Sequence, residues 1–230
     1  MNGMVTVRQY PSSGVNRQEV FRYAGVAEPT AELSALLEDV LEEAEGQLSG
    51  QICWAEFSLA EAPEGLDLGF AQCRSQSLSR HLKDCSRIVV FAATVGMGLD
   101  RLIARYSRIS PSRALMFQAL GAERIESLCD GFCEEIRLRA SEQGLTTVSR
   151  FSPGYGDLSL ALQKDIFRVL DCPKKIGLTL NESLLMSPSK SVTAIIGIGR
   201  CPGHSGEAGC DSCEKTDCVF RRSQCESRNL

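Results

Sequence analysis

Residues 87–94 form the segment that most constrains the fold of this chain. From Ile88 to Ala93 the side chains are apolar without interruption, and several are β-branched or aromatic. A strand with one wet face alternates apolar and polar residues, whereas a short continuous apolar run is typical of a strand buried on both faces. The sequence therefore predicts a sheet strand that is covered by other elements on each side.

Helices to cover such a sheet are indicated by apolar residues at helical spacing. Thr30 is a suitable N-cap for a helix that continues to Ala44, and Pro111 suits the first turn of a long helix that reaches residue 143 before Gly144. The other elements expected are helices over residues 75–85 and 159–170, and a helix that opens within residues 95–100 and continues to Tyr106. Extended segments are expected over residues 52–59, 146–151 and 192–198. Residues 1–199 are thus expected to form a single α+β domain.

The bulk properties exclude several classes of protein. A chain of 230 residues can bury a substantial core. Its net charge of −4 argues against a nucleic-acid partner, because nucleic-acid binders carry basic surfaces. It has neither the roughly twenty consecutive apolar residues that would span a membrane nor the apolar segment of a secretory signal. A cytoplasmic location is expected.

The chain contains eleven cysteines, and in a reducing compartment they are not expected to form a disulfide framework. Free cysteine behaves as a small buried hydrophobe, so core packing is the expected role of the six that are scattered along the chain. These are Cys53, Cys73, Cys85, Cys129, Cys133 and Cys172. The other five fall within the last thirty residues, which is not a packing pattern.

Residues 200–230 are expected to be a small cysteine-rich module that binds a metal. The segment is poor in apolar residues, so it cannot fold by burial alone. Thiolates suit zinc or an iron–sulfur cluster, and a tetrahedral set needs four ligands. The proposed ligands are Cys201, Cys210, Cys213 and Cys218, with Cys225 and His204 as further candidates. The alternatives are a disordered tail with redox-labile thiols or partial cysteine pairing.

Residues 150–155, Arg-Phe-Ser-Pro-Gly-Tyr, are the candidate binding segment. Arg150 offers a planar fork of donors that suits a carboxylate. Glycine has no Cβ, so the backbone at Pro153 and Gly154 can approach a ligand closely. Tyr155 can cover an adenine ring or donate its hydroxyl. By itself such a loop is more often a structural turn between a strand and a helix.

The continuation of this segment resembles a known family. Arg-x-x-Pro-Gly-Tyr at residues 150–155 is followed by a helix that ends near Leu170, then by Glu-Ser-x-x-Met-x-Pro at residues 182–188, and by Ser191 and Val192. Over about fifty residues this order and spacing resemble the activation domain of cobalamin-dependent methionine synthase. The resemblance implies a twisted, mainly antiparallel sheet flanked by helices.

The resemblance also implies a function. In that family the domain binds S-adenosylmethionine, whose methyl group, with one electron from an external donor, restores methylcobalamin from cob(II)alamin. The binding residues implied are Arg150 for the methionine part of the cofactor and Ser152, Pro153, Gly154 and Tyr155 for the pocket, with Glu126 as the acidic contact. Glu126 also fits a solvated helix face.

Two departures from the family indicate a separate subunit. Residues 156–159 replace a stretch that bears proline, cysteine and histidine, and the cysteine-rich tail replaces an aromatic-rich strand. We therefore expect an activator that is inactive alone and serves a cobalamin-binding methionine synthase chain lacking its own activation domain. The alternatives are an iron–sulfur or cysteine-rich redox partner of another corrinoid methyltransferase, and a non-catalytic interaction module.

Overall fold

The computed structural model describes residues 3–11 and 14–200, and a five-stranded antiparallel sheet forms its centre. Each strand runs opposite to its neighbours, and β6 and β10 are paired along their whole length. The order across the sheet is β1 (Thr6–Tyr10), β2 (Gly50–Ser58), β6 (Cys85–Thr94), β10 (Ser191–Gly199) and β7 (Thr146–Thr147).

The three central strands are buried on both faces, as the sequence predicts for residues 87–94. In β6, Val89, Phe91 and Ala93 belong to one apolar cluster, and Ile88, Val90 and Ala92 belong to another on the opposite face. This division follows from the two-residue period of a strand. The sheet therefore separates two cores.

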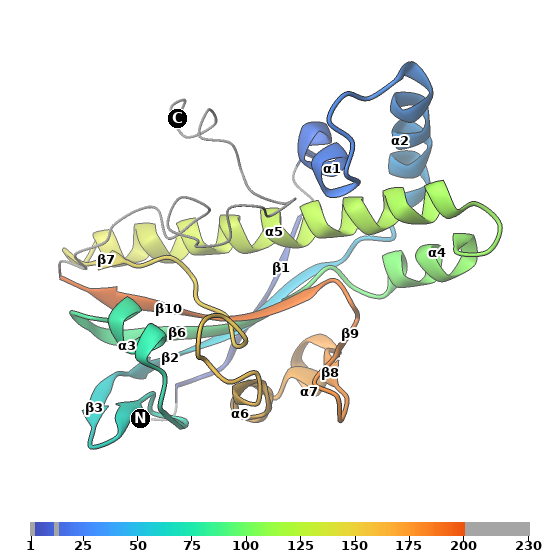
Figure 1. The fold of residues 1–230 in the computed structure, drawn as a ribbon. Coiled ribbons are helices and arrows are strands. Elements are labelled where there is room, and N and C mark those ends of the chain that lie inside the picture. The colour runs from blue at the N-terminus through green and yellow to red at the C-terminus, as the bar shows by residue number, and fades with distance from the viewer. Residues whose placement is uncertain (1–2, 12–13, 201–230) are drawn as a thin grey trace.

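One face of the sheet is covered by a long helix and three shorter ones (Figure 1). The long helix α5 (Pro111–Ser141) lies along the sheet, and Gly144 follows it with a positive φ of 69°, as expected of a helix stop. Phe132 of α5 packs at ring-centroid distances of 5.2 Å from Trp54 and 4.9 Å from Phe91. The three shorter helices are α1 (Arg17–Tyr23), α2 (Ala31–Ala44) and α4 (Gly98–Tyr106).

The opposite face is covered by short elements (Figure 1). Three helices contribute apolar side chains there: α3 (Gln76–His81), α6 (Leu162–Leu170) and α7 (Cys172–Ile176). A three-stranded sheet consists of β3 (Ala60–Ala62), β4 (Gly65–Asp67) and β5 (Gln72–Cys73), and a hairpin consists of β8 (Thr179–Leu180) and β9 (Met186–Ser187).

The predicted α+β fold with a mainly antiparallel sheet is confirmed, with local differences. Strand β1 and helix α1 come from the polar N-terminal stretch, for which no element was predicted. The helix expected over residues 75–85 ends at His81, because Asp84 adopts a left-handed φ of 68° and the chain enters β6 at Cys85. The helix expected from residue 159 begins at Leu162, after a turn.

Two further predictions concern the described residues alone. Within the described residues, no helix is long and apolar enough to cross a membrane. The six scattered cysteines are free thiols, and each is buried or half-buried, as core packing predicts.

The loop that follows residue 151 is tied to α3 by Asp157. The carboxylate accepts the Ser75 hydroxyl at 2.5 Å and the backbone N–H groups of Gln76 and Ser77 at 2.8 and 3.0 Å. These donors stabilise the charged form and hold the pKa of Asp157 well below its usual range. A contact across about eighty residues of sequence thus joins the loop to the first turn of a helix.

We expect Phe132→Ala to destabilise the fold by about 3–5 kcal/mol, because Phe132 is fully buried among three aromatic rings and its removal leaves a cavity. The measurement is urea unfolding followed by the fluorescence of Trp54. Leu138→Ala on the same helix is the control, since Leu138 is 51% exposed. Equal unfolding midpoints for the two variants would contradict the packing described.

We expect the stability lost in Asp157→Asn to depend on pH. The lowered pKa means that the carboxylate stabilises the fold above about pH 4 and loses that contribution as the pH falls toward the folded-state pKa. The difference in the free energy of unfolding between wild type and Asp157→Asn should be largest at neutral pH and should shrink below about pH 4. Urea unfolding at several pH values measures it, with Asp165→Asn as a surface control; a pH-independent difference would refute the role of the charge.

Candidate functional site

The candidate binding segment lies at the outer edge of β10. Phe151 exchanges two backbone hydrogen bonds of 2.9 Å with Ile195, and the Val148 N–H donates to the Gly197 carbonyl at 3.0 Å. The extended conformation predicted for residues 146–151 is therefore confirmed. Because neighbouring side chains of an extended chain point to opposite faces, Arg150 contacts α5 whereas Phe151 contacts α3.

Arg150 forms a compact charged cluster with two carboxylates of α5. Its guanidinium donates to Glu126 and to Asp130, each at 2.5 Å. The side chain of Arg150 is 21% exposed, whereas those of Glu126 and Asp130 are 34% and 54% exposed. The cluster carries one excess negative charge, and all three side chains remain accessible to solvent.

Two thiols lie behind this cluster on the same helix. Burial raises the pKa of Cys129 and of Cys133, and the nearby positive charge of Arg150 only partly opposes this. Both thiols therefore stay protonated at neutral pH and add no charge. The charge of the cluster is set by Arg150, Glu126 and Asp130.

The backbone N–H groups of the Pro153–Gly154 turn donate hydrogen bonds within the turn itself. The Gly154 N–H donates to the Leu158 carbonyl at 2.8 Å, and the Tyr155 N–H donates to the Ser152 carbonyl at 3.1 Å. Proline has no N–H, so neither Pro153 nor Gly154 offers a free backbone donor in this conformation. Gly154 has a φ of 95°, which explains the need for glycine. Contacts with a ligand would therefore use carbonyl groups and side chains.

Aromatic side chains line the opposite side of the segment. Tyr155 is 60% exposed, and its ring meets the Phe151 ring edge-on at a centroid distance of 6.0 Å. Phe151 in turn packs against the His81 ring at 5.0 Å. The same imidazole lies within hydrogen-bonding distance of the Ser149 carbonyl, at 2.6 Å from Nε2. Tyr155 thus presents an accessible aromatic face beside the turn.

The structure brings the predicted residues to one edge of the sheet and adds two that the sequence reasoning missed, Asp130 and His81. Asp130 lies four residues after Glu126, so helical spacing would have placed both on one face. His81 had no such signal, because its contact with Phe151 depends on how α3 packs. Glu182 and Ser183 lie exposed in the turn between β8 and β9.

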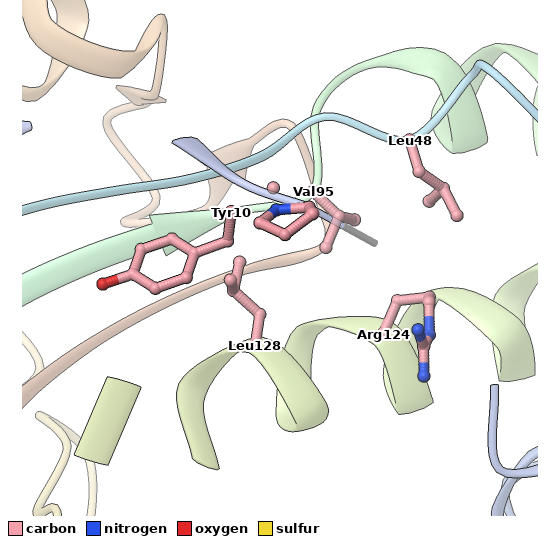
Figure 2. Close-up of a pocket in the computed structure, with 7 residues that line it drawn as sticks. Tyr10, Leu48, Val95, Arg124 and Leu128 are labelled. Atoms are coloured by element: carbon pink, nitrogen blue, oxygen red, sulfur yellow. The ribbon is translucent and has the colours of Figure 1, made fainter. Parts of the chain in front are cut away.

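Two cavities in the described part of the chain lie away from residues 150–155. One of about 40 Å³ lies between α5 and the ends of β1 and β6, where Arg124 and Leu128 project from α5 near Tyr10, Leu48 and Val95 (Figure 2). This volume suits water but not a nucleoside. A larger groove of about 630 Å³ lies between α2, α5 and the start of α1, with apolar residues and four carboxylates in its lining. The segment 150–155 lines neither of these two cavities.

The proposed metal ligands Cys201, Cys210, Cys213 and Cys218 lie outside the described residues. Within residues 3–11 and 14–200, no group of three or more histidine, cysteine or acidic side chains is arranged to hold a metal ion.

Comparisons with known proteins match the fold and this region of the chain. The family model described as "Vitamin B12 dependent methionine synthase, activation domain" matches residues 76–200, which is more than half of the chain. The crystal structure of the MetH reactivation domain bound to AdoHcy superposes with a TM-score of 0.63 at 16% identity, covering 89% of this chain and 80% of that chain. A comparison with curated protein sequences gave no match. The matched segment begins at α3 and ends after β10, so it includes the whole candidate site. The chain therefore belongs to the family of vitamin B12-dependent methionine synthase activation domains.

Proposed function

We propose that this chain binds S-adenosylmethionine and supports the reductive methylation of cob(II)alamin on a separate methionine synthase chain. When bound, S-adenosylmethionine supplies a methyl group. The observation that carries the proposal is the cluster of Arg150, Glu126 and Asp130 on one side of the sheet edge, with the exposed Tyr155 ring on the other side, in a chain of this family.

The charges of the cluster fit the ligand. S-adenosylmethionine carries a carboxylate, an ammonium and a sulfonium, and thus one excess positive charge, whereas the cluster carries one excess negative charge. Arg150 has the donor geometry for the carboxylate, and Glu126 and Asp130 can accept from the ammonium. In the free protein these three side chains satisfy one another.

Binding requires Arg150, Glu126 and Asp130 to replace their mutual ion pairs by contacts with the ligand, and the free-energy cost of this replacement should be small. Partly exposed ion pairs are screened by water and contribute on the order of 0–1 kcal/mol each. Glu126 and Asp130 are exposed enough to rotate toward a ligand while Arg150 stays anchored at the sheet edge. The free-state ion pairs therefore keep Arg150 oriented without blocking the site.

The other end of an elongated ligand would meet the loop. Tyr155 offers an exposed ring for stacking with an adenine base, and Ser152 is half-buried beside Pro153 in the same turn. Because Arg150 and Phe151 point to opposite faces of the sheet edge, the ligand would run across that edge. A ligand that lies across the sheet edge would leave one of its sides open to a partner protein.

The partner in this proposal is a cobalamin-binding methionine synthase chain that lacks its own activation domain, together with an electron donor. The second candidate function is that of an iron–sulfur or cysteine-rich redox partner of another corrinoid methyltransferase. The feature that favours it is the density of cysteines after residue 200. In either case Cys201, Cys210, Cys213 and Cys218 are the proposed ligands of zinc or of a cluster.

We expect Arg150→Ala to weaken S-adenosylmethionine binding about tenfold to a hundredfold, because hydrogen bonds to charged groups contribute roughly 1.5–3 kcal/mol. The measurement is calorimetric titration of the full chain. Arg137→Ala is the matched control, since Arg137 also pairs with an acidic residue on α5 but lies outside the cluster. The absence of binding to wild type would overturn the proposed function, and equal affinity in both variants would remove Arg150 from the site.

We expect the purified full chain to contain a stoichiometric metal that is lost in the double variant Cys210→Ser and Cys213→Ser. Metal analysis and visible absorption measure it, because zinc gives colourless protein and an iron–sulfur cluster gives charge-transfer bands. Iron with acid-labile sulfide would favour the redox function. Metal-free wild type after anaerobic reconstitution would overturn the proposed site.

A further inference from the structure

The short helix α3 contacts the candidate binding loop at both of its ends. At the C-terminal end of the helix, His81 contacts Ser149 and Phe151, at the start of the loop. At the N-terminal end, Ser75, Gln76 and Ser77 hold Asp157, at the end of the loop. Helix α3 together with its N-cap Ser75 therefore spans the nine-residue loop 149–157.

The two ends of the contact have different physical character. Asp157 is held by a hydroxyl and two backbone N–H groups, and the neighbouring Gly156 approaches so closely that a Cβ there would lie 2.7 Å from the Ser77 hydroxyl. This end fixes the position of the backbone. The His81 end combines a hydrogen bond with a ring contact, so it acts on Ser149 and Phe151, the two neighbours of Arg150.

We propose that His81 is a positioning residue for the ligand loop. Its imidazole holds the Ser149 carbonyl, which is joined directly to the Arg150 amide, and its ring supports Phe151, against which Tyr155 packs. One side chain thus orients both the guanidinium and the exposed aromatic ring. This inference rests on the proposed function only in that the loop is taken to bind S-adenosylmethionine.

The two contacts of His81 can be separated by substitution. The hydrogen bond requires a proton on Nε2, because a carbonyl oxygen only accepts. Glutamine places an amide N–H at a similar reach and retains this bond without the ring. Phenylalanine retains the ring against Phe151 without the donor, and alanine removes both.

The test compares the full-length wild type with His81→Ala, His81→Gln and His81→Phe. Calorimetric titration of S-adenosylmethionine should show affinity about tenfold weaker in His81→Ala, the effect of a lost hydrogen bond together with a ring contact, and recovery of most of it in His81→Gln. Arg80→Ala, an exposed position on the same turn of α3, is the matched control and should bind as wild type does. Unfolding midpoints of the variants should stay close to that of Arg80→Ala.

Amide hydrogen exchange gives a second measurement that needs no ligand. The Gly154 and Tyr155 amides are bonded within the turn, so they should exchange faster in His81→Ala and return toward wild-type rates in His81→Gln. Unchanged affinity and unchanged exchange in His81→Ala would overturn the positioning role. If wild type binds no S-adenosylmethionine, the proposed function fails, and the exchange rates alone decide whether His81 positions the loop.

Discussion

The burial of β6 and β10 on both faces is the constraint on which the rest of the structure depends. Their side chains supply apolar surface to two cores, so the chain must provide covering elements above and below the sheet. The long helix α5 covers one face, and α3, α6 and α7 cover the other (Figure 1). The outer edge of β10 is then the place where both covering layers can contribute side chains to one segment.

Helix α5 links the core to the candidate site. Its buried side supports the aromatic cluster around Phe132, and Glu126 and Asp130, which precede Phe132 by six and two residues, reach the edge of the sheet. A rigid helix fixes the spacing of the two carboxylates, because side chains four residues apart lie on one face. The packing of the core thereby determines where the charges stand relative to Arg150.

The site combines opposite charges, an exposed ring and a turn whose amides are already bonded. This arrangement suits a zwitterionic ligand with a base at its far end, since each part has a complementary group and none requires a deep cavity. The free protein keeps Arg150 oriented through its ion pairs and the loop oriented through α3. Such preorganisation reduces the ordering cost of binding.

The sequence by itself determined the class of the fold, the strand at residues 87–94, the long helix from Pro111 and the family, because these depend on periodicity and local motifs. It also pointed to Arg150 and Glu126, although as separate contacts rather than as an ion pair. Only the tertiary structure decided that Asp130 completes their cluster and that α3 contacts the loop through His81 and through the groups that hold Asp157. The reason is physical: these contacts join residues about twenty to eighty positions apart, and their geometry follows from how the helices pack on the sheet.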